Sequence, residues 1–157
     1  MKREVTVDYN IKVLWHAISR MYNQQGSEYG ITASIGFVLL NIDCDSGTPA
    51  TKIAPLLGLE TRSLTRMLKS LEEKGLIYRK KDITDKRSVR IYLTEEGKRK
   101  RKISAKTVKA FNNKVSAIIP EEQLENFFDV INLIEKVIEN SGKQDSPKKI
   151  KQEVTIN

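Results

Sequence analysis

A short stretch of the chain combines an apolar helical stripe with side chains that can bind nucleic acid. The stripe is formed by Leu64, Met67, Leu68 and Leu71, which recur at the spacing of one helix face. The opposite face carries hydroxyl and cationic groups: Thr61, Arg62, Ser63, Thr65, Arg66 and Lys69. Arginine can bridge the guanine acceptors in a DNA major groove, and serine or threonine can bond to bases or phosphates. The stretch therefore predicts a helix that can enter a major groove.

Capping residues and alternation predict the limits of this helix and the elements that follow it. Thr61 can serve as the N-cap, and Gly75 can end the helix because glycine adopts the left-handed conformation. Residues 77–81 and 89–93 alternate and are rich in β-branched or aromatic side chains, which predicts two strands. Thr94 then begins a long helix as its expected cap. We therefore expect a β-hairpin between two helices.

The loop of this hairpin, residues 82–88, is polar and has a cationic tip. Lys86, Arg87 and Ser88 lie in the loop, and Arg90 lies on the return strand. Such a tip can reach phosphate or a narrow minor groove, where the enhanced negative potential attracts arginine. A helix suited to the major groove followed by a hairpin with arginine at its tip is the pattern of a winged helix.

The residues before the 61–73 helix predict a second helix and a tight turn. Thr48-Pro49 is typical of a helix start, with a capping hydroxyl followed by proline at the first helical position. This helix should run to Leu57, although Pro55 in its interior can bend or shorten it. Gly58 supplies the turn, so the two helices have the helix-turn-helix arrangement.

Positive charge is concentrated in one part of the chain. The 157 residues carry a net charge of +8. Residues 62–102 hold fifteen lysines and arginines against six acids, a net charge of +9, and the remaining residues sum to −1. A confined cationic region indicates a polyanionic partner. The seven cations between 97 and 109 are equally compatible with a solvated helix surface and with attraction to DNA backbone.

The sequence argues against several other functions. It shows no Ser-His-Asp or Cys-His set and no phosphate-binding glycine loop, and its single histidine, His16, leaves no basis for a metal site. We therefore expect no enzyme activity and no cofactor. Cys44 is the single cysteine, next to Asp43 and Asp45, and is expected to be an ordinary half-buried thiol. No apolar stretch approaches a membrane span, so we expect a cytoplasmic protein with no membrane partner.

The two ends of the chain carry helices with more apolar surface than a small winged domain can cover. Residues 9–25 and residues 97–140 both show wide apolar faces, which a symmetric homodimer would bury. The expected fold class is mainly α with a small β-hairpin wing: a winged helix-turn-helix domain plus a terminal-helix dimerisation bundle. The expected divisions are residues 1–31 (N-terminal dimerisation helix), 32–96 (DNA-binding domain), 97–140 (C-terminal dimerisation helices) and 141–157 (polar tail).

The run from 57 to 97 resembles the MarR family of bacterial winged helix-turn-helix transcription regulators. The matching residues are Leu71-Glu72-Glu73-Lys74-Gly75-Leu76-Ile77-Tyr78-Arg79, the wing motif Asp85-Lys86-Arg87-Ser88, and Arg90-Ile91-Tyr92-Leu93-Thr94-Glu95-Glu96-Gly97. The helices on either side match the family in order and length, so the resemblance extends over residues 9–140, outside the motif block by pattern alone.

This resemblance implies a homodimer that binds a palindromic double-stranded DNA operator, and a pocket where small anionic or phenolic ligands or a redox cysteine weaken that binding. It implies that Arg87 enters the minor groove and that Asp85 steadies the wing through a neighbouring arginine such as Arg90. The polar residues of the 61–69 face would contact the major groove. Peroxide-sensing members carry a cysteine in the first helix, which this chain lacks, and Pro55 is a second departure.

The leading hypothesis is a dimeric, sequence-specific transcription regulator, a repressor released by a small effector. Two alternatives stay open: a non-specific or architectural nucleic-acid-binding protein, and an interaction module that keeps the winged fold without DNA binding. The candidate effector pocket consists of Trp15, Met21, Tyr22, Phe37 and Phe111.

Overall fold

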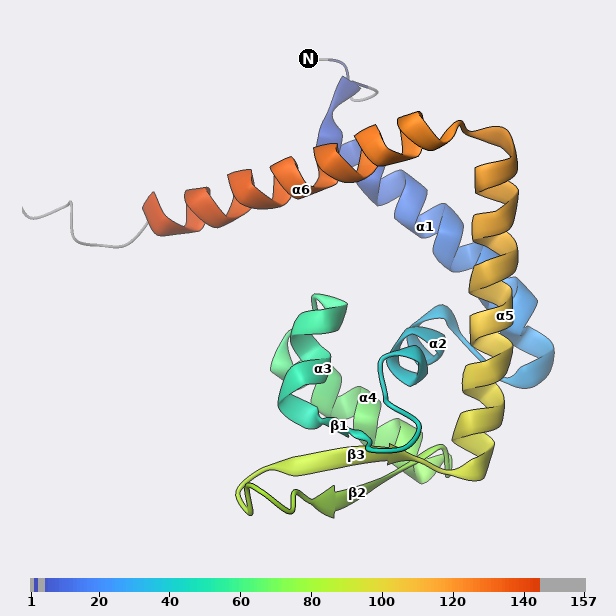
Figure 1. Ribbon diagram of the computed structural model, residues 1–157, viewed down its shortest axis with the longest axis vertical. Helices are drawn as coiled ribbons and strands as arrows, with labels where there is room; N and C mark the ends of the chain where they lie inside the picture. Colours follow the sequence, from blue (N-terminus) through green and yellow to red (C-terminus); the bar gives the residue numbers. More distant parts are fainter. Residues whose placement is uncertain (1, 3–4, 145–157) are drawn as a thin grey trace, which may run out of the picture. The chain divides into compact units, whose positions relative to one another are not determined.

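The computed structural model describes residue 2 and residues 5–144 of the chain. The chain forms two compact units, residues 1–110 and residues 111–157 (Figure 1). The predicted fold class is confirmed, since the chain is mainly helical with one small antiparallel sheet. Within the described residues, no helix is both long and apolar enough to cross a bilayer. The predicted polar tail begins inside the last helix, and its residues 145–157 lie outside the described part.

Five helices lie wholly or partly in the first unit. They are α1 (Val7–Gly26), α2 (Ala33–Leu40), α3 (Ala50–Leu57), α4 (Thr61–Glu73) and the first part of α5 (Glu95–Ile118), with a 3-10 turn η2 (Ser27–Tyr29) after α1. The Thr94 hydroxyl accepts a hydrogen bond from the Gly97 amide (3.0 Å), as expected for the cap of α5. Thr61 is the first residue of α4 rather than its N-cap, which is Glu60, so that capping prediction was wrong.

The sheet has one strand more than the predicted hairpin. Strands β2 (Ile77–Lys81) and β3 (Val89–Leu93) pair antiparallel as expected, and β1 (Thr48–Pro49) pairs with the free edge of β3. Thr48-Pro49 was therefore wrongly predicted to start a helix. Its backbone pairs with Ile91 and Arg90, and the Thr48 hydroxyl accepts from the Asp43 amide (3.0 Å) instead of capping α3.

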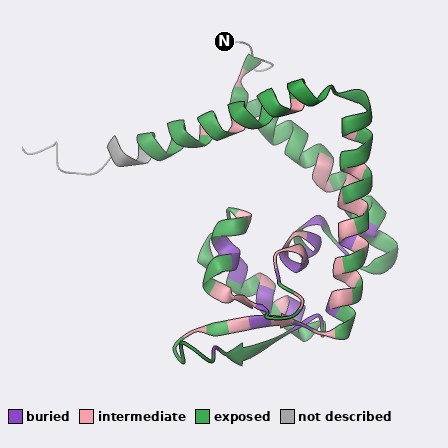
Figure 2. Ribbon diagram, viewed as in Figure 1, coloured by how far each residue is buried: buried purple, intermediate pink, exposed green. Residues whose placement is uncertain are grey.

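The core of the first unit forms where α4 covers one face of this sheet. The buried residues of α4 are Leu64, Leu68 and Leu71, and those of the two longer strands are Ile77, Ile91 and Leu93 (Figure 2). Residues from α2 and α3 complete the same cluster: Ile35, Val38, Leu39, Ile53 and Ala54. Burying apolar surface contributes a free energy of about 25 cal/mol per Å² removed from water. The burial of these side chains therefore holds α4 on the sheet.

A tight glycine turn joins α3 to α4 as predicted. Gly58 has φ +61°, a left-handed conformation that favours glycine, and the Leu59 amide donates to the Ala54 carbonyl (3.0 Å). Pro55 lies in the interior of α3, and the helix ends two residues later at Leu57. The helix-turn-helix arrangement is thus present with a short first helix.

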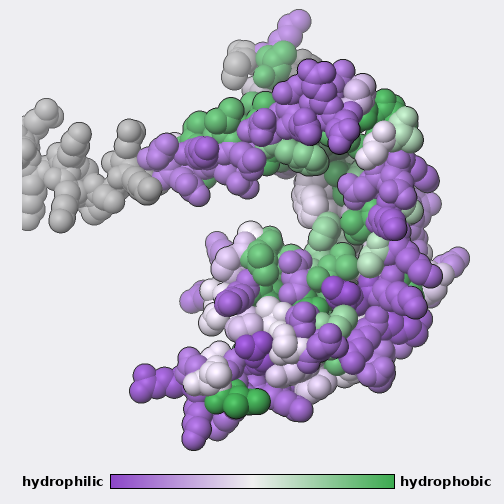
Figure 3. Space-filling model, viewed as in Figure 1, coloured by the Kyte–Doolittle hydropathy of each residue, from purple (hydrophilic) through white to green (hydrophobic). Residues whose placement is uncertain are grey.

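The second unit contains the end of α5 and helix α6 (Glu121–Gln144), which begins after Pro120. Many of the large apolar side chains of α6 are exposed: Phe127, Phe128, Val130, Leu133, Val137 and Ile138. Hydrophobic side chains gather along α6 in Figure 3. The described part of the chain thus leaves a wide apolar face of α6 exposed.

Gly97, in the first turn of α5, lies against the backbone of Leu76, just before β2. A Cβ atom at this position would lie 2.0 Å from the Leu76 carbonyl oxygen, which is backbone and cannot swing aside. The same carbonyl accepts from the Thr94 amide (3.1 Å), so the contact helps set where α5 begins. The helix needs glycine here for close approach rather than for an unusual φ.

We therefore predict that Gly97→Ala lowers the free energy of unfolding by about 1–3 kcal/mol because of overpacking. The predicted sign of this change in the free energy of unfolding is the opposite of the usual one, since alanine normally stabilises a helix interior by about 0.5–1 kcal/mol relative to glycine. Urea denaturation followed by circular dichroism measures the change. A variant as stable as the wild type would show that α5 does not pass this close to Leu76.

Candidate nucleic-acid interface

Helix α4 presents its polar face to solvent because its apolar face is committed to the core. Leu64, Leu68 and Leu71 are at most 4% exposed. The predicted binding residues Thr61, Arg62, Ser63, Thr65, Arg66 and Lys69 are all exposed. Among the described residues, Arg62 and Arg66 take part in no ion pair, whereas Lys69 lies 4.0 Å from Glu73. The structure thus brings the predicted residues together on one accessible face with two uncommitted guanidinium groups.

The hairpin follows α4 directly and forms the wing. Gly75 has φ +68° and lies one residue beyond the C-cap of α4, as predicted. The wing loop closes on itself through the Asp82 amide, which donates to the Ser88 carbonyl (3.0 Å), and the Ser88 amide, which donates to the Asp85 carbonyl (2.9 Å). Lys86 and Arg87 at its tip are exposed. The loop is therefore an ordered turn that presents two cations to solvent.

A buried carboxylate at the base of the wing organises this turn. The Asp82 side chain is 7% exposed and accepts from the Thr84 hydroxyl (2.7 Å), the Thr84 amide (2.9 Å) and the Arg90 Nε (2.9 Å). These hydrogen bonds, first those from Thr84 and then that from Arg90, hold the pKa of Asp82 far below its usual range. Asp82 is therefore ionised whenever the protein is folded near neutral pH.

Arg90, on β3, also binds the loop that precedes the neighbouring strand β1. Its terminal nitrogen Nη1 donates to the backbone carbonyls of Ser46 (3.1 Å) and Gly47 (3.2 Å), in the loop before β1. One guanidinium group thus ties the wing, through Asp82, to a segment more than forty residues earlier. Arg90 was predicted to contact DNA, and its hydrogen bonds give it a structural role in the wing.

The expected Asp85–Arg90 pair is wrong, because Arg90 pairs with Asp82. Asp85 instead accepts from the Arg87 amide (3.0 Å) and shapes the tip of the loop. Sequence reasoning missed Asp82, although a signal was present. Asp82 directly follows strand β2, and Thr84 comes two residues later. This pattern is typical of an Asx turn, in which the aspartate carboxylate accepts a hydrogen bond from the backbone amide two residues later in the sequence.

The cationic run at the start of α5 is partly neutralised within the helix. Lys98 pairs with Glu95 (3.3 Å), and Arg99 makes two hydrogen bonds to the Glu96 carboxylate (2.8 and 2.7 Å). The Arg99 hydrogen bond is the main cause of the lowered pKa of Glu96. Exposed pairs of this kind contribute little stability, but they reduce the free positive charge of α5.

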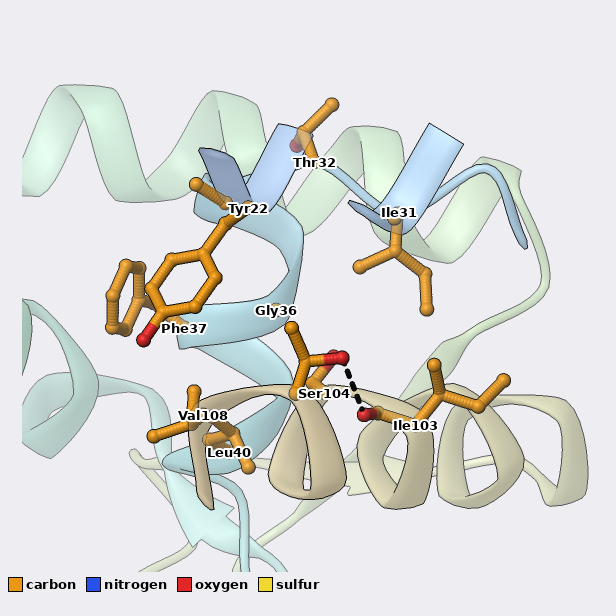
Figure 4. A pocket seen from close by; sticks show the side chains of 12 residues that line it. Tyr22, Ile31, Thr32, Gly36, Phe37, Leu40, Ile103, Ser104 and Val108 are labelled. Carbon is orange, nitrogen blue, oxygen red and sulfur yellow. Dashed lines mark hydrogen bonds between the residues drawn. The ribbon is translucent and has the colours of Figure 1, made fainter. Parts of the chain in front are cut away.

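The predicted effector pocket is only partly assembled. Tyr22 of α1 and Phe37 of α2 lie edge to face (6.0 Å between centroids) beside a cavity of about 30 Å³, where Gly36 of α2 lies against Ser104 of α5 (Figure 4). Trp15 contacts Phe37 (5.5 Å) but does not line the cavity, nor does Met21, and Phe111 belongs to the second unit. Burial raises the pKa of the Tyr22 phenol. A cavity of this size holds one or two water molecules.

Comparison with known proteins identifies the family. A sequence model of the MarR family matches residues 31–89. The HTH-type transcriptional regulator SarZ of Staphylococcus aureus (strain MRSA252) is 30% identical over 128 residues, which cover 81% of this chain and 85% of SarZ. The chain belongs to the MarR family. The match to SarZ of Staphylococcus epidermidis is 35% identical over 81 residues and spans 52% of this MarR chain and 55% of that regulator.

Solved structures show the same MarR fold. The transcriptional regulator SlyA superposes with a TM-score of 0.78 at 24% identity, covering 90% of this chain and 100% of SlyA. MepR of S. aureus, solved as a complex with DNA, superposes with a TM-score of 0.76 at 22% identity, covering 84% of this chain and 98% of MepR. These likenesses establish the winged-helix fold of this MarR chain.

Other chemistry expected or excluded from the sequence can be placed in this MarR fold. Cys44 is a free, half-buried cysteine packed against the core, in the loop after α2. Within the described residues, no group of histidine, cysteine and acidic side chains could hold a metal ion.

We predict that Asp82→Asn loosens the wing, because the amide cannot accept charged hydrogen bonds from Arg90 and Thr84 together. Amide hydrogen exchange at Thr84 and Asp85 should become faster, with Asp85→Asn as the matched control that affects only the Arg87 amide. A carboxylate with a lowered pKa contributes stability above its unfolded pKa of about 3.9, and this is lost as the pH falls through the lower folded value. The ratio of the wild-type protection factor to that of Asp82→Asn should therefore be constant from about pH 5 to pH 8. Equal exchange in both variants would contradict the role of Asp82.

Proposed function

We propose that this chain is a dimeric, sequence-specific DNA-binding repressor of transcription that a small effector releases from its operator. The observation that supports it best is the face of α4, where Arg62 and Arg66 are exposed between hydroxyl side chains and, among the described residues, form no ion pair. Side chains of these types discriminate base pairs in a major groove. The family relationship supports the proposal, and MepR, a structural neighbour, has been solved in complex with DNA.

The wing adds a second contact in this proposal. Lys86 and Arg87 are exposed at its tip, and the loop is held by hydrogen bonds to Asp82 and Asp85. A preorganised tip loses little conformational freedom when it meets DNA, which favours binding. In this proposal Arg87 enters the minor groove, as the family motif implies, and Lys86 and Ser88 contact DNA beside it.

The architectural alternative depends on unspecific positive charge and is less well supported. Two cations of the α5 run, Lys98 and Arg99, are paired with acids of the same helix. The other five cations of the run form no ion pair among the described residues, like Arg62 and Arg66 of α4, so the hydroxyl side chains of α4 are what favours sequence-specific binding. Binding by bulk charge would not require hydroxyl side chains between the arginines.

The homodimer is supported by apolar side chains that neither unit buries. On α1 the exposed ones are Val7, Tyr9, Ile11, Val13, Leu14 and Trp15, between 39% and 52% exposed. On α6 the set is Phe127, Phe128, Val130, Leu133, Val137 and Ile138. A symmetric partner with the same surfaces would cover both. Two subunits would then present two copies of α4 to successive major grooves, about 34 Å apart.

The effector would bind in one of two places in the first unit. The cavity beside Tyr22 and Phe37 would have to open, since it holds about 30 Å³. A larger groove of about 390 Å³ lies between α3 and α4, lined among others by Thr61, Thr65 and Arg79. Hydroxyl and guanidinium groups suit a small anionic or phenolic ligand. Because coupling is reciprocal, any such ligand must bind the DNA-bound form more weakly.

The proposed DNA function is tested by binding to the DNA upstream of the gene for this chain and to scrambled DNA of equal length. We expect the wild type to prefer its own DNA by about a hundredfold, or ~3 kcal/mol. Arg62→Ala should lose about 1–3 kcal/mol of this discrimination. Arg87→Ala should bind more weakly, and Lys114→Ala is the control that removes one exposed charge outside the wing, α4 and the 97–109 run. Equal binding of the two DNAs over a salt series would favour the architectural alternative.

The dimer is tested by Phe127→Asp, which places a charge in the apolar face of α6. Phe127 is 48% exposed, so the change removes little core packing. We expect the molecular mass from sedimentation equilibrium to fall from two chains to one and operator affinity to fall with it. Asn132→Asp adds the same charge on the polar side of α6 and should leave the mass unchanged. A monomeric wild type would contradict this part of the proposal.

A further inference from the structure

Ile83 is the most exposed large hydrophobic side chain in the described part of the chain. It is 93% exposed and lies in the wing loop. In Figure 3 a hydrophobic patch interrupts the hydrophilic surface around the wing. Isolated exposed apolar residues are common, so exposure alone implies little. Ile83 differs from an ordinary exposed residue because it lies in the wing loop, which is proposed to contact DNA.

The backbone on both sides of Ile83 is anchored, so the side chain is held outward. Asp82 before it is buried, and its amide donates to the Ser88 carbonyl (3.0 Å). Thr84 after it binds the Asp82 carboxylate through both its amide (2.9 Å) and its hydroxyl (2.7 Å). Ile83 cannot turn into the core without breaking these bonds. The loop therefore presents an isoleucine in a defined direction.

The surroundings of Ile83 match one kind of surface. Lys86 and Arg87 are exposed in the same turn, and among the described residues they form no ion pair. An apolar side chain beside two cations is complementary to a DNA minor groove, which has phosphates at its rims and the C–H edges of deoxyribose along its walls. Proteins that bind this groove combine basic side chains with apolar ones such as isoleucine.

We propose that Ile83 makes the wing select A·T over G·C base pairs in the minor groove; this rests on the proposed DNA-binding function. On the minor-groove floor A·T pairs show only acceptors, whereas G·C pairs add the 2-amino group of guanine. That amino group projects from the floor and obstructs an aliphatic side chain. It also loses its water without gaining a partner, which costs free energy. The narrower groove of A·T tracts encloses the side chain more closely.

The test begins with selection of binding duplexes from a random library by the wild type, Ile83→Ala and Leu56→Ala. Leu56 is 63% exposed on α3 and outside the wing, so it controls for loss of exposed apolar surface. The selected duplex is then made with A·T, G·C, inosine·C or 2,6-diaminopurine·T pairs at the flanking minor-groove positions. Inosine lacks the amino group of guanine, and 2,6-diaminopurine adds it to adenine.

We expect the wild type and Leu56→Ala to bind the A·T and inosine·C duplexes about tenfold more tightly than the other two. Ile83→Ala should select the same central motif, lose the flank preference and keep the wild-type melting temperature. If Ile83→Ala keeps the preference, the role of Ile83 is wrong and the DNA-binding function stands. If the wild type selects no sequence from the library, both proposals fail.

Discussion

The packing of α4 on the small sheet is the constraint on which the rest of the first unit depends. Three short strands cannot enclose a core by themselves, so their apolar face must be covered. Leu64, Leu68 and Leu71 cover it against Ile91 and its neighbours. Turning α4 by one residue, about 100°, would bring either Lys69 and Glu72 or Ser63 and Ser70 into this contact. The core therefore determines which face of α4 meets solvent, and with it the direction of the candidate binding residues.

A series of hydrogen bonds connects the loop before β1 to the wing and fixes the conformation of both. The Asp43 carboxylate accepts from the Ser46 amide (2.7 Å) and hydroxyl (2.9 Å), which bends the loop before β1. The bent loop turns the Ser46 and Gly47 carbonyls toward Arg90, and Arg90 holds Asp82. Gly47 has φ +65°, and a Cβ there would lie 2.6 Å from the Ile91 carbonyl. The wing is thus supported from both edges of the sheet, which would help the loop keep its shape in the proposed contact with DNA.

Helices α1 and α6 keep apolar side chains exposed that the core of the first unit does not bury. Residues such as Trp15 of α1 and Phe128 of α6 remain about half exposed, although each belongs to a helix with a wide apolar face. In the proposed dimer this surface sets the distance between two α4 helices. A ligand that changes helix packing near Tyr22 and Ser104 could then alter DNA affinity without touching DNA. Regulation would act through geometry, and the charges of α4 and the wing would stay the same.

Much of this protein could be predicted from local sequence. The spacing of Leu64, Leu68 and Leu71 determines an amphipathic α4, and Gly75 ends it because few other residues adopt its φ. The alternation around Ile91 predicts the hairpin, and the motif from Leu71 to Gly97 points to the MarR family. These features depend on neighbours within a few residues, where periodicity and capping act directly.

The remaining features were decided by tertiary structure. Thr48-Pro49 has the local signature of a helix start, but the unpaired edge of β3 makes it a strand. Arg90 could have paired with either wing carboxylate, and it pairs with Asp82, which is buried at the base of the turn while Asp85 lies at the exposed tip. The Tyr22–Phe37 cavity likewise needs Gly36 and Ser104 from two separate helices. Local sequence determined the elements and their polar faces, and only the folded chain decided which distant groups meet, because pairing and burial depend on partners far away in sequence.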